Sequence, residues 1–561
     1  MADVEVSLDA GERPAWLREA PFWALVLLVL PTYFHRLGAR VVRHEEPHRG
    51  QVAVEMMASG DWIVPREQGL PLLSRPPVHN WLIAGVVKLS DRLDAHAIRL
   101  PSALSVLATV LLLYAYSRRF LGQLGAFAAG AAYATMGQVL EMGTKGETEA
   151  LFTLEVTISL LVWHAAAARG PISTARWVLA YAFVAVGTLT KGPQAPIYFA
   201  GGVGLYLLWR RRWRELLRPG QWIGLAVYVA LVCLWLVPFW RTMGFAKVLK
   251  IFFGDVGYRF DESSLLGVIA HLATYPVDVL GSILPWSVLL FAYASRRFRA
   301  RLGRFSDAAL FLWLCIAVSF PSCWFPPGSK PRYYMPLYPC MAVLIGAVVE
   351  RSASVADEGW TRIWHGLRRT LGVVSGLAGV ALLGAKLLGP EDWVAGQTLG
   401  FVIVFAAASL ACAALLLGPG PPPRRAGERR VGAAVAAATA WIGLAFAGVA
   451  MNHWIATSGD VAQEVEALRA RLPAGVRVYS IGYVDPVFVH YWGEPVALVF
   501  WDPEGVFSVP PEVEYFTFTP DYGGGTIESI RFDYELIATI DCDHTPHETP
   551  FRVVYVGRVI R

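Results

Sequence analysis

A polar stretch near the N-terminus carries the side chains best suited to chemistry. From His44 it reads HEEPHRGQVAVEMMASGDWIVPREQGLPLLSRPPVHNW. It contains the adjacent carboxylates Glu45 and Glu46, which are followed by His48 and Arg49. A carboxylate at the boundary between apolar and aqueous surroundings has a raised pKa and can act as a general base. Because adjacent acids are also common in ordinary solvated loops, the spacing alone leaves both interpretations open.

The same stretch ends in a basic group beside two prolines. Arg75 precedes Pro76 and Pro77, which stiffen the backbone, and His79 follows. A rigidly held guanidinium can offer two parallel hydrogen bonds to a phosphate. An arginine that anchors the loop at the membrane surface fits the residues equally well.

The elements that position these side chains are apolar enough to be membrane helices. Of the 561 residues, 55% are hydrophobic and 17% are charged, whereas a soluble protein has about 25% charged residues. Repeated apolar runs predict a mainly α polytopic membrane bundle of the following thirteen spans. They are about 21–38, 99–117, 121–138, 148–168, 176–190, 193–209, 220–240, 274–294, 307–324, 333–350, 369–388, 397–417 and 432–451.

Arginines are concentrated in every second connecting loop, and this pattern predicts the orientation of the chain in the membrane. They cluster after the even-numbered spans, which places those loops and the N-terminus in the cytoplasm. The first span lacks a cleavage site and is expected to be retained. Two long loops, residues 39–98 and 241–273, then lie on the outer side, and so does the C-terminus.

The C-terminal residues have the composition of a small soluble domain. An amphipathic helix is expected from Gly459, followed by five strand-like runs beginning at Val476, Val496, Glu514, Glu535 and Arg552. This pattern predicts an α/β domain on the outer face. The domains are therefore expected to be 1–455 in the membrane and 456–561 outside it.

Basic residues occur on outer loops, where topology does not require them. Lys191 closes a span in LTKGP, and Lys330, Arg332, Tyr333 and Tyr334 lie in the hairpin SKPRYYMPLYP. A bound anion such as a lipid phosphate is the simplest explanation for this charge. The tyrosines could hydrogen-bond that anion, or they could belong to an interfacial aromatic belt.

Arg259 is a further candidate for the same anion. It follows Asp255 by four residues in FFGDVGYRF, within the second long outer loop. This spacing is also that of an ordinary helical ion pair, worth about 0.3 kcal/mol.

Other chemistries find little support. There is no Walker loop and no GxGxxG after a strand, and the histidines at 48, 79 and 271 lack metal-ligand spacing. The six cysteines contain no CxxC pair and are expected to be buried apolar side chains, although Cys323 and Cys340 flank one hairpin. The sequence predicts no nucleic-acid partner and no certain cofactor, and it leaves a divalent metal open but unsupported.

Several motifs occur together in a defined order. The EEPHRG…ASGDW…RPP block comes first, then LTKGP, the RF pair at Arg259, PW at Pro285–Trp286, RYxxP at Arg332 and YVDPVFVHYWGEP from Tyr483. In this respect the chain resembles the GT-C glycosyltransferases related to 4-amino-4-deoxy-L-arabinose lipid A transferases and protein O-mannosyltransferases. The resemblance implies a thirteen-helix bundle whose outer-face cavity holds a polyprenyl-phosphate sugar.

The resemblance also implies roles for individual residues. Glu45 matches the family's catalytic Asp and is one methylene longer, and Glu46 matches the adjacent acid. Arg75 replaces the family's Lys before Pro-Pro. Ser74 stands where the aminoarabinose branch has an acid, so a metal contact made by that acid cannot be carried over. These departures, with His48-Arg49 in place of Arg-Tyr, argue against the aminoarabinose substrate.

The resemblance therefore implies an inverting glycosyltransferase of the bacterial inner membrane. Its donor would be a polyprenyl-phosphate sugar, and its acceptor a lipid A-like glycolipid, a polysaccharide or a protein in the periplasm. Glu45, assisted by Glu46, would act as the base, while His48, Arg49 and His79 would contact the acceptor. The donor phosphate would bind Arg75, Lys191, Arg259, Lys330, Arg332, Tyr333 and Tyr334. The alternatives are a polyprenyl-phosphate transporter or flippase, and a non-catalytic homologue.

Overall fold

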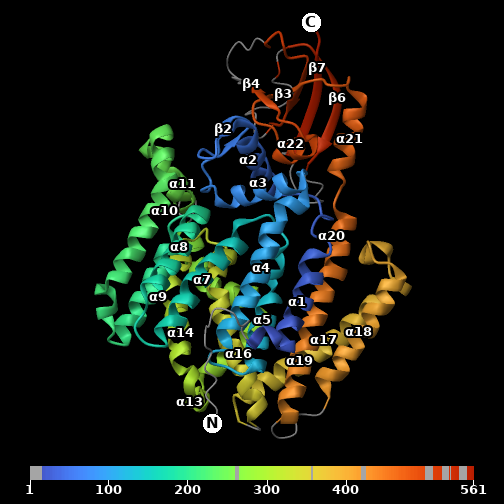
Figure 1. The fold of residues 1–561 in the computed structure, drawn as a ribbon. Helices are drawn as coiled ribbons and strands as arrows, with labels where there is room; N and C mark the ends of the chain where they lie inside the picture. The colour runs from blue at the N-terminus through green and yellow to red at the C-terminus, as the bar shows by residue number, and fades with distance from the viewer. Residues whose placement is uncertain are drawn as a thin grey trace. The chain divides into compact units, whose positions relative to one another are not determined.

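The computed structural model of the chain is mainly helical (Figure 1). It describes residues 15–258, 264–355, 358–418, 425–499, 509–520, 530, 532–542 and 552–561. The chain divides into two compact units. We call them the helical unit (Met1–His35, Ser102–Thr144 and Thr148–Ala450) and the mixed unit (Arg36–Pro101, Lys145–Glu147 and Met451–Arg561).

Each of the thirteen expected spans coincides with one or more helices. Those helices are α1 (Ala20–Val29), α4 (Ala95–Ser117), α5 (Gln123–Ala134), α7 (Thr148–Ala167), α8 (Thr174–Lys191), α9 (Gln194–Trp209), α10 (Pro219–Met243), α12 (Leu265–Ser282), α14 (Ser306–Ser319), α16 (Tyr338–Ser354), α17 (Thr361–Leu388), α18 (Leu399–Leu417) and α19 (Arg425–Leu444). Among the described residues, nine helical stretches are long and apolar enough to cross a membrane. The chain is therefore a multi-span membrane protein, as expected, while the total of thirteen stays a prediction.

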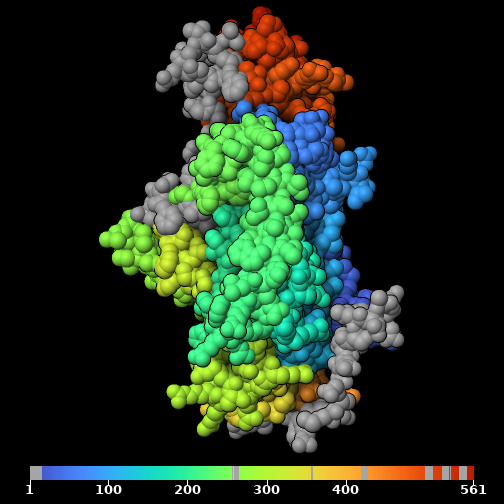
Figure 2. Space-filling model, turned by 60° about the vertical axis from the view of Figure 1, so that its left-hand side comes forward, coloured from blue at the N-terminus to red at the C-terminus, as the bar shows by residue number. Residues whose placement is uncertain are grey.

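The helical unit has a tightly packed centre and an apolar surface. At the centre, Gly346 of α16 packs so closely on α5 that an added Cβ would lie 2.3 Å from the Gly125 carbonyl oxygen. Such small-residue contacts let membrane helices approach backbone to backbone. At the surface, α10 runs along the face seen in Figure 2 and exposes Trp222 and Leu234. An apolar surface of this kind suits contact with lipid tails.

The second expected outer loop is more ordered than the sequence suggested. Residues 241–273 contain α11 (Phe245–Tyr258) and the first part of α12. Ser264 caps α12 by accepting a hydrogen bond from Gly267 N at 3.1 Å. The expected span 274–294 is in fact the end of α12 and the 3-10 helix η4 (Trp286–Ala294), which are separated at Pro285. Proline lacks the backbone N–H that would continue the helix.

The mixed unit contains a five-stranded sheet whose strands overlap the five strand-like runs of the sequence. They are β3 (Val478–Ile481), β4 (Ala497–Val499), β5 (Tyr515–Phe518), β6 (Tyr534–Asp541) and β7 (Val553–Val559). Their order is β4-β3-β5-β7-β6. Strand β3 pairs in parallel with β4 and β5, and β7 pairs antiparallel with β5 and β6.

Each face of this sheet is covered by apolar side chains. Helices α21 (Val461–Arg471) and α22 (Pro486–Trp492) contribute to a core that includes Phe488 and Val556. A second apolar cluster on the sheet includes Phe516 and Phe518. Figure 1 shows both helices beside the strands. The sequence indicated α21, whereas the short α22 was not expected.

The first outer loop belongs to the same compact unit as this sheet. Its helix α2 (Glu46–Ser59) reaches α22 through Gln51, whose side-chain amide donates to the Pro486 carbonyl at 2.6 Å. Tyr491 Oη accepts from Val42 N at 2.9 Å. The expected boundary at residue 455 therefore separates segments that pack together, and the division into domains 1–455 and 456–561 stays a prediction.

Candidate functional site

The two adjacent carboxylates at the start of α2 have different surroundings. Glu46 is 2% exposed and accepts hydrogen bonds from Arg99 Nε and Nη2, at 2.6 and 2.8 Å, and from Gly146 N at 2.8 Å. Burial raises the pKa of Glu46, but the charge and hydrogen bonds of Arg99 outweigh burial and lower it to about 2. Both carboxylate oxygens are engaged, so we expect Glu46 to position the segment around it, and its expected catalytic role stays a prediction.

Arg99 connects Glu46 to the segment that precedes it. This buried guanidinium, on α4, donates to the carbonyls of Leu37 and Arg40 at 2.9 Å and of Val41 at 3.0 Å. Buried charges are tolerated when every donor and acceptor is paired in this way. The Glu46–Arg99 pair therefore fixes the backbone from which Glu45 projects.

Glu45 remains accessible. Its side chain is 44% exposed and accepts from Arg49 Nη2 at 2.9 Å, while the Arg49 side chain is only 5% exposed. Arg49 Nη1 also donates to Ser74 Oγ at 3.3 Å. Arg75 Nη1 donates to the Ser74 carbonyl at 3.0 Å. The mixed unit thus brings the carboxylate at 45 and the basic group at 75 together through one buried arginine.

His48 is bound to an acid that the sequence did not single out. Its Nδ1 lies 2.8 Å from the carboxylate of Glu67, which is fully buried. Tyr483 Oη donates to the same carboxylate at 3.0 Å. Burial lowers the pKa of His48, but the hydrogen bond and charge of Glu67 outweigh it, so the pKa lies above its usual value.

This pair predicts a pH-dependent stability. The raised pKa means that His48 stabilises the folded mixed unit fully below about pH 6.5, and that this contribution is lost as the pH rises through its folded value. His48→Gln should lower the free energy of unfolding by about 1.5 kcal/mol at pH 6 and by little at pH 9. Thermal unfolding of the purified chain between pH 6 and pH 9 measures this difference.

The matched control is His453→Gln, because His453 is exposed in the same unit. It should leave the pH dependence as in the unsubstituted chain. An identical loss of stability in His48→Gln at both pH values would contradict the expectation, because it would show that His48 does not change protonation between pH 6 and pH 9.

The SGDW turn, which the sequence marked as specific, has a structural role. Asp61 Oδ1 accepts hydrogen bonds from Ile63 N at 3.0 Å and from Val64 N at 3.1 Å. The Trp62 carbonyl accepts from Trp81 Nε1 at 3.0 Å. These contacts shape the turn that leads into the hairpin of β1 (Arg66–Glu67) and β2 (Leu70–Pro71), and so they position Glu67.

His79 does not occupy the position expected of it. It lies in the first turn of α3 (Val78–Ser90) and is fully buried. A side chain in this position cannot contact an acceptor without a rearrangement. The expected acceptor role of His79 is therefore not supported by its burial.

A second cluster of charges lies in the helical unit, where Lys191 meets Glu149. Lys191 Nζ is 2.9 Å from Glu149 Oε1, and both side chains are buried. Arg332 Nε lies 3.7 Å from the same oxygen. Lys191 Nζ also lies 5.1 Å from the ring centroid of Tyr333 and 5.7 Å from that of Phe152. Two cations and one carboxylate leave a net positive charge beside aromatic faces.

The structure gives less on the other basic and aromatic candidates. Tyr334 is buried, and its hydroxyl donates to the Ile316 carbonyl, so its expected role as a phosphate ligand stays a prediction. Lys330 is exposed. Arg259 lies outside the described residues.

The chain is similar in sequence to known proteins. The sequence profile of a family described as dolichyl-phosphate-mannose-protein mannosyltransferase matches residues 74–240. Undecaprenyl phosphate-alpha-4-amino-4-deoxy-L-arabinose arabinosyl transferase 2 of Pseudomonas fluorescens is 30% identical over 409 residues, 68% of this chain and 65% of that protein. The corresponding transferase of Pseudomonas aeruginosa strain LESB58 is 30% identical over 321 residues, 55% of each. The chain spans less than two thirds of these relatives.

The similarity to solved structures covers more of the chain than the similarity to the sequence relatives. The crystal structure of ArnT from Cupriavidus metallidurans bound to undecaprenyl phosphate matches with a TM-score of 0.70 over 96% of this chain and 99% of that chain, at 19% identity. The apo structure of the same protein gives 0.68 at 20% identity. The chain has the ArnT fold. The resemblance inferred from the sequence motifs is thereby confirmed.

Within the ArnT fold, the residues of this chain do not suit a metal at position 74. Ser74 offers a neutral hydroxyl that already accepts from Arg49, and the next residue is Arg75. Two guanidinium groups beside one hydroxyl disfavour a divalent cation, which prefers carboxylate oxygens. Among the described residues, no three His, Cys, Asp or Glu side chains form a metal-binding group.

Proposed function

We propose that this chain is an integral membrane glycosyltransferase that moves a sugar from a polyprenyl-phosphate carrier to an acceptor in the bacterial envelope. The observation that carries the proposal is Glu45, a half-exposed carboxylate oriented by the buried Arg49. The curated relatives support the class of donor, since their names describe transfer from an undecaprenyl-phosphate sugar. The acceptor is a lipid A-like glycolipid, a polysaccharide or a protein.

The proposed reaction is a displacement at the anomeric carbon. Glu45 accepts the proton of an acceptor hydroxyl, and the hydroxyl oxygen forms a bond to the anomeric carbon. The bond from that carbon to the phosphate oxygen breaks, and its electron pair stays with the polyprenyl phosphate. Attack from the opposite face inverts the anomeric configuration. If the acceptor is an ionised phosphate, Glu45 positions it without taking a proton.

Lys191 and Arg332 are proposed to stabilise the phosphate as it gains charge. Glu149 lies 2.9 Å from Lys191 Nζ and compensates the charge of this buried ammonium. A cation fixed in advance lowers the energy of the charge that develops on the leaving group. Arg75 and Arg259 are proposed to contribute in the same way.

The orientation is part of the proposal. The arginine asymmetry of the loops supports thirteen spans in the bacterial inner membrane, with the N-terminus in the cytoplasm and residues 456–561 in the periplasm. Each loop assigned to the cytoplasm is rich in arginine, whereas the short outer loops are poor in lysine and arginine.

Transfer by the purified chain tests the function. The chain, an undecaprenyl-phosphate-linked sugar and a crude envelope fraction should together release undecaprenyl phosphate and label an acceptor. NMR of the product should show an inverted anomeric centre. Sugar that crosses a vesicle membrane without bond cleavage would identify a transporter, and donor that stays intact would indicate a non-catalytic homologue.

The buried pair in the helical unit yields a second expectation. Lys191→Met should cost about 3–5 kcal/mol of stability, because it leaves the buried Glu149 without its nearest cation. The double variant Glu149→Gln/Lys191→Met should regain most of that stability. It should still transfer sugar poorly, with a raised KM for the donor, because a phosphate-binding cation is missing. Thermal unfolding and donor titration measure the two effects separately.

The double variant also decides between two roles for Lys191. Normal donor KM and normal transfer in the stable double variant would make Lys191 a purely structural partner of Glu149. That outcome would remove Lys191 from the donor site and leave the proposed transfer reaction untouched.

A further inference from the structure

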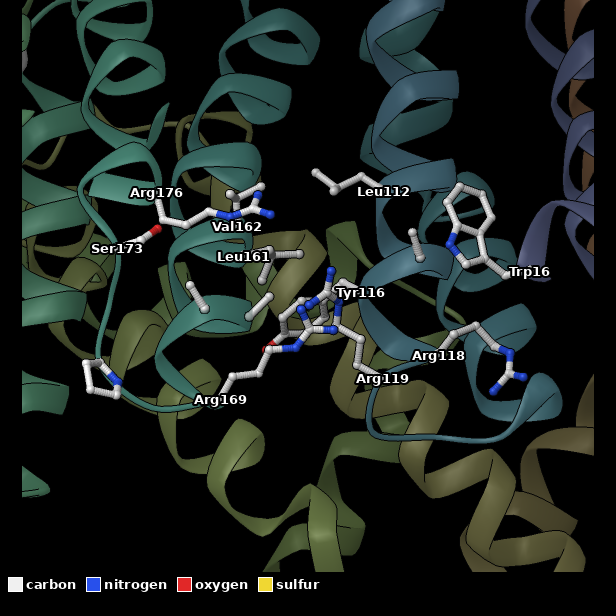
Figure 3. Close-up of a pocket in the computed structure, with 14 residues that line it drawn as sticks. Trp16, Leu112, Tyr116, Arg118, Arg119, Leu161, Val162, Arg169, Ser173 and Arg176 are labelled. Atoms are coloured by element: carbon white, nitrogen blue, oxygen red, sulfur yellow. The ribbon is translucent and has the colours of Figure 1, made fainter. Parts of the chain in front are cut away.

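The helical unit contains a cavity of about 430 Å³ where α4 ends and α8 begins (Figure 3). Its walls are mixed in character. Leu112, Leu161 and Val162 form part of an apolar side, and Trp16 stands at the edge. The loops at this end of the helices are among those predicted to face the cytoplasm.

Four arginines line the same cavity, and one of them is already paired. Arg118 donates to Glu19 through Nε at 2.8 Å and through Nη2 at 2.7 Å. Among the described residues, no carboxylate forms an ion pair with Arg119, Arg169 or Arg176. Within the described part of the chain, three like charges therefore share one hollow without a carboxylate at ion-pair distance.

Three of these arginines converge on one hollow. Figure 3 shows Arg119 and Arg169 extending toward Tyr116, and Arg176 toward Val162, while Arg118 points away. Arg119 and Arg169 are exposed at the mouth of the hollow, and Arg176 is half-buried. Burial lowers the pKa of Arg119, and the nearby charges of Arg169 and Arg176 lower it further. An anion in the cavity would relieve this repulsion.

The apolar wall restricts the kind of anion. A small inorganic anion gains nothing from leucine and valine side chains, whereas a lipid carries a phosphate and an acyl chain in one molecule. Tryptophan at the rim suits the level of the headgroups. Arginine binds phosphate oxygens through two parallel hydrogen bonds.

We propose that Arg119, Arg169 and Arg176 bind the phosphate of an anionic phospholipid whose acyl chain lies against the apolar wall of this cavity. The site is separate from the residues assigned to sugar transfer, so it stands or fails independently of that function. Each arginine should strengthen lipid binding by about fivefold.

Native mass spectrometry of the detergent-solubilised full chain tests the proposal, with phosphatidylglycerol and phosphatidylcholine as probes. The chain should retain phosphatidylglycerol in preference to phosphatidylcholine. The triple variant R119Q/R169Q/R176Q should lose roughly 100-fold in affinity for phosphatidylglycerol. Full retention of phosphatidylglycerol by the triple variant would overturn the proposal.

A matched control separates this site from bulk positive charge. The variant R211Q/R362Q/R429Q removes the same three charges from arginines outside the cavity and should keep wild-type lipid retention. An equal loss in the control would overturn the proposal, because it would assign the effect to net charge.

Two further arms distinguish a lipid from free phosphate. Ala166→Phe fills part of the cavity without removing a charge, and it should weaken phosphatidylglycerol binding. Inorganic phosphate should not displace the lipid at equal concentration. Equal competition by inorganic phosphate, or unchanged lipid binding in Ala166→Phe, would overturn the lipid assignment.

Discussion

Glu45→Gln is expected to lower sugar transfer by roughly 10²- to 10⁴-fold, the range for loss of a general base. The glutamine oxygen can still accept the hydrogen bond from Arg49, so the chain should fold and insert normally. The amide cannot take the proton of an acceptor hydroxyl. The measurement is the release of undecaprenyl phosphate by purified variant and unsubstituted chains at saturating donor.

Two further variants test whether the loss of transfer is specific to the carboxylate at position 45. Glu45→Asp keeps a carboxylate at the length found in the related transferases, and it should retain far more activity than Glu45→Gln. Glu466→Gln changes an exposed acid of α21 and should leave transfer unchanged. Unsubstituted rates in Glu45→Gln would remove Glu45 from the role of base.

Arg99→Met is expected to destabilise the folded mixed unit strongly. It leaves the buried carboxylate of Glu46 without its cation and the carbonyls of Leu37, Arg40 and Val41 without a donor. Breaking a buried pair in this way costs about 3–5 kcal/mol. The apparent Tm should fall by roughly 10 °C, as measured by thermal unfolding in detergent.

Variants of Glu46 and Arg92 supply the controls. The double variant Glu46→Gln/Arg99→Met should recover part of the lost Tm, because it no longer buries a lone charge. Arg92→Met removes an exposed arginine of the same unit and should change the Tm little. A fully stable but inactive Glu46→Gln would contradict the positioning role and return Glu46 to the chemistry.

The sequence predicted where the helices and strands lie because their patterns are local. Apolar runs locate the helices to within a few residues, and β-branched runs locate the strands. The break at Pro285 and the helices within residues 241–273 were missed, because their composition resembles that of neighbouring spans and loops.

The partners of the candidate residues could not be predicted in the same way. Glu67 lies 19 residues from His48, Glu149 lies 42 from Lys191, and Arg99 lies 53 from Glu46. Each partner is a single charged residue outside any motif, so only the fold identifies it. Tyr333 and Tyr334 are adjacent and alike in sequence, yet one ring lies beside Lys191 and the other is buried in the core.

The pairing of the first outer loop with the C-terminal sheet has a consequence for biosynthesis. Tyr483 and Glu67 are separated by 416 residues, and a ribosome needs roughly 20–80 s to add that length of chain. During that time Glu67 and Gln51 lack Tyr483 and the Pro486 carbonyl as partners. The loop that carries Glu45 therefore reaches its final form only when the last fifth of the chain has been made.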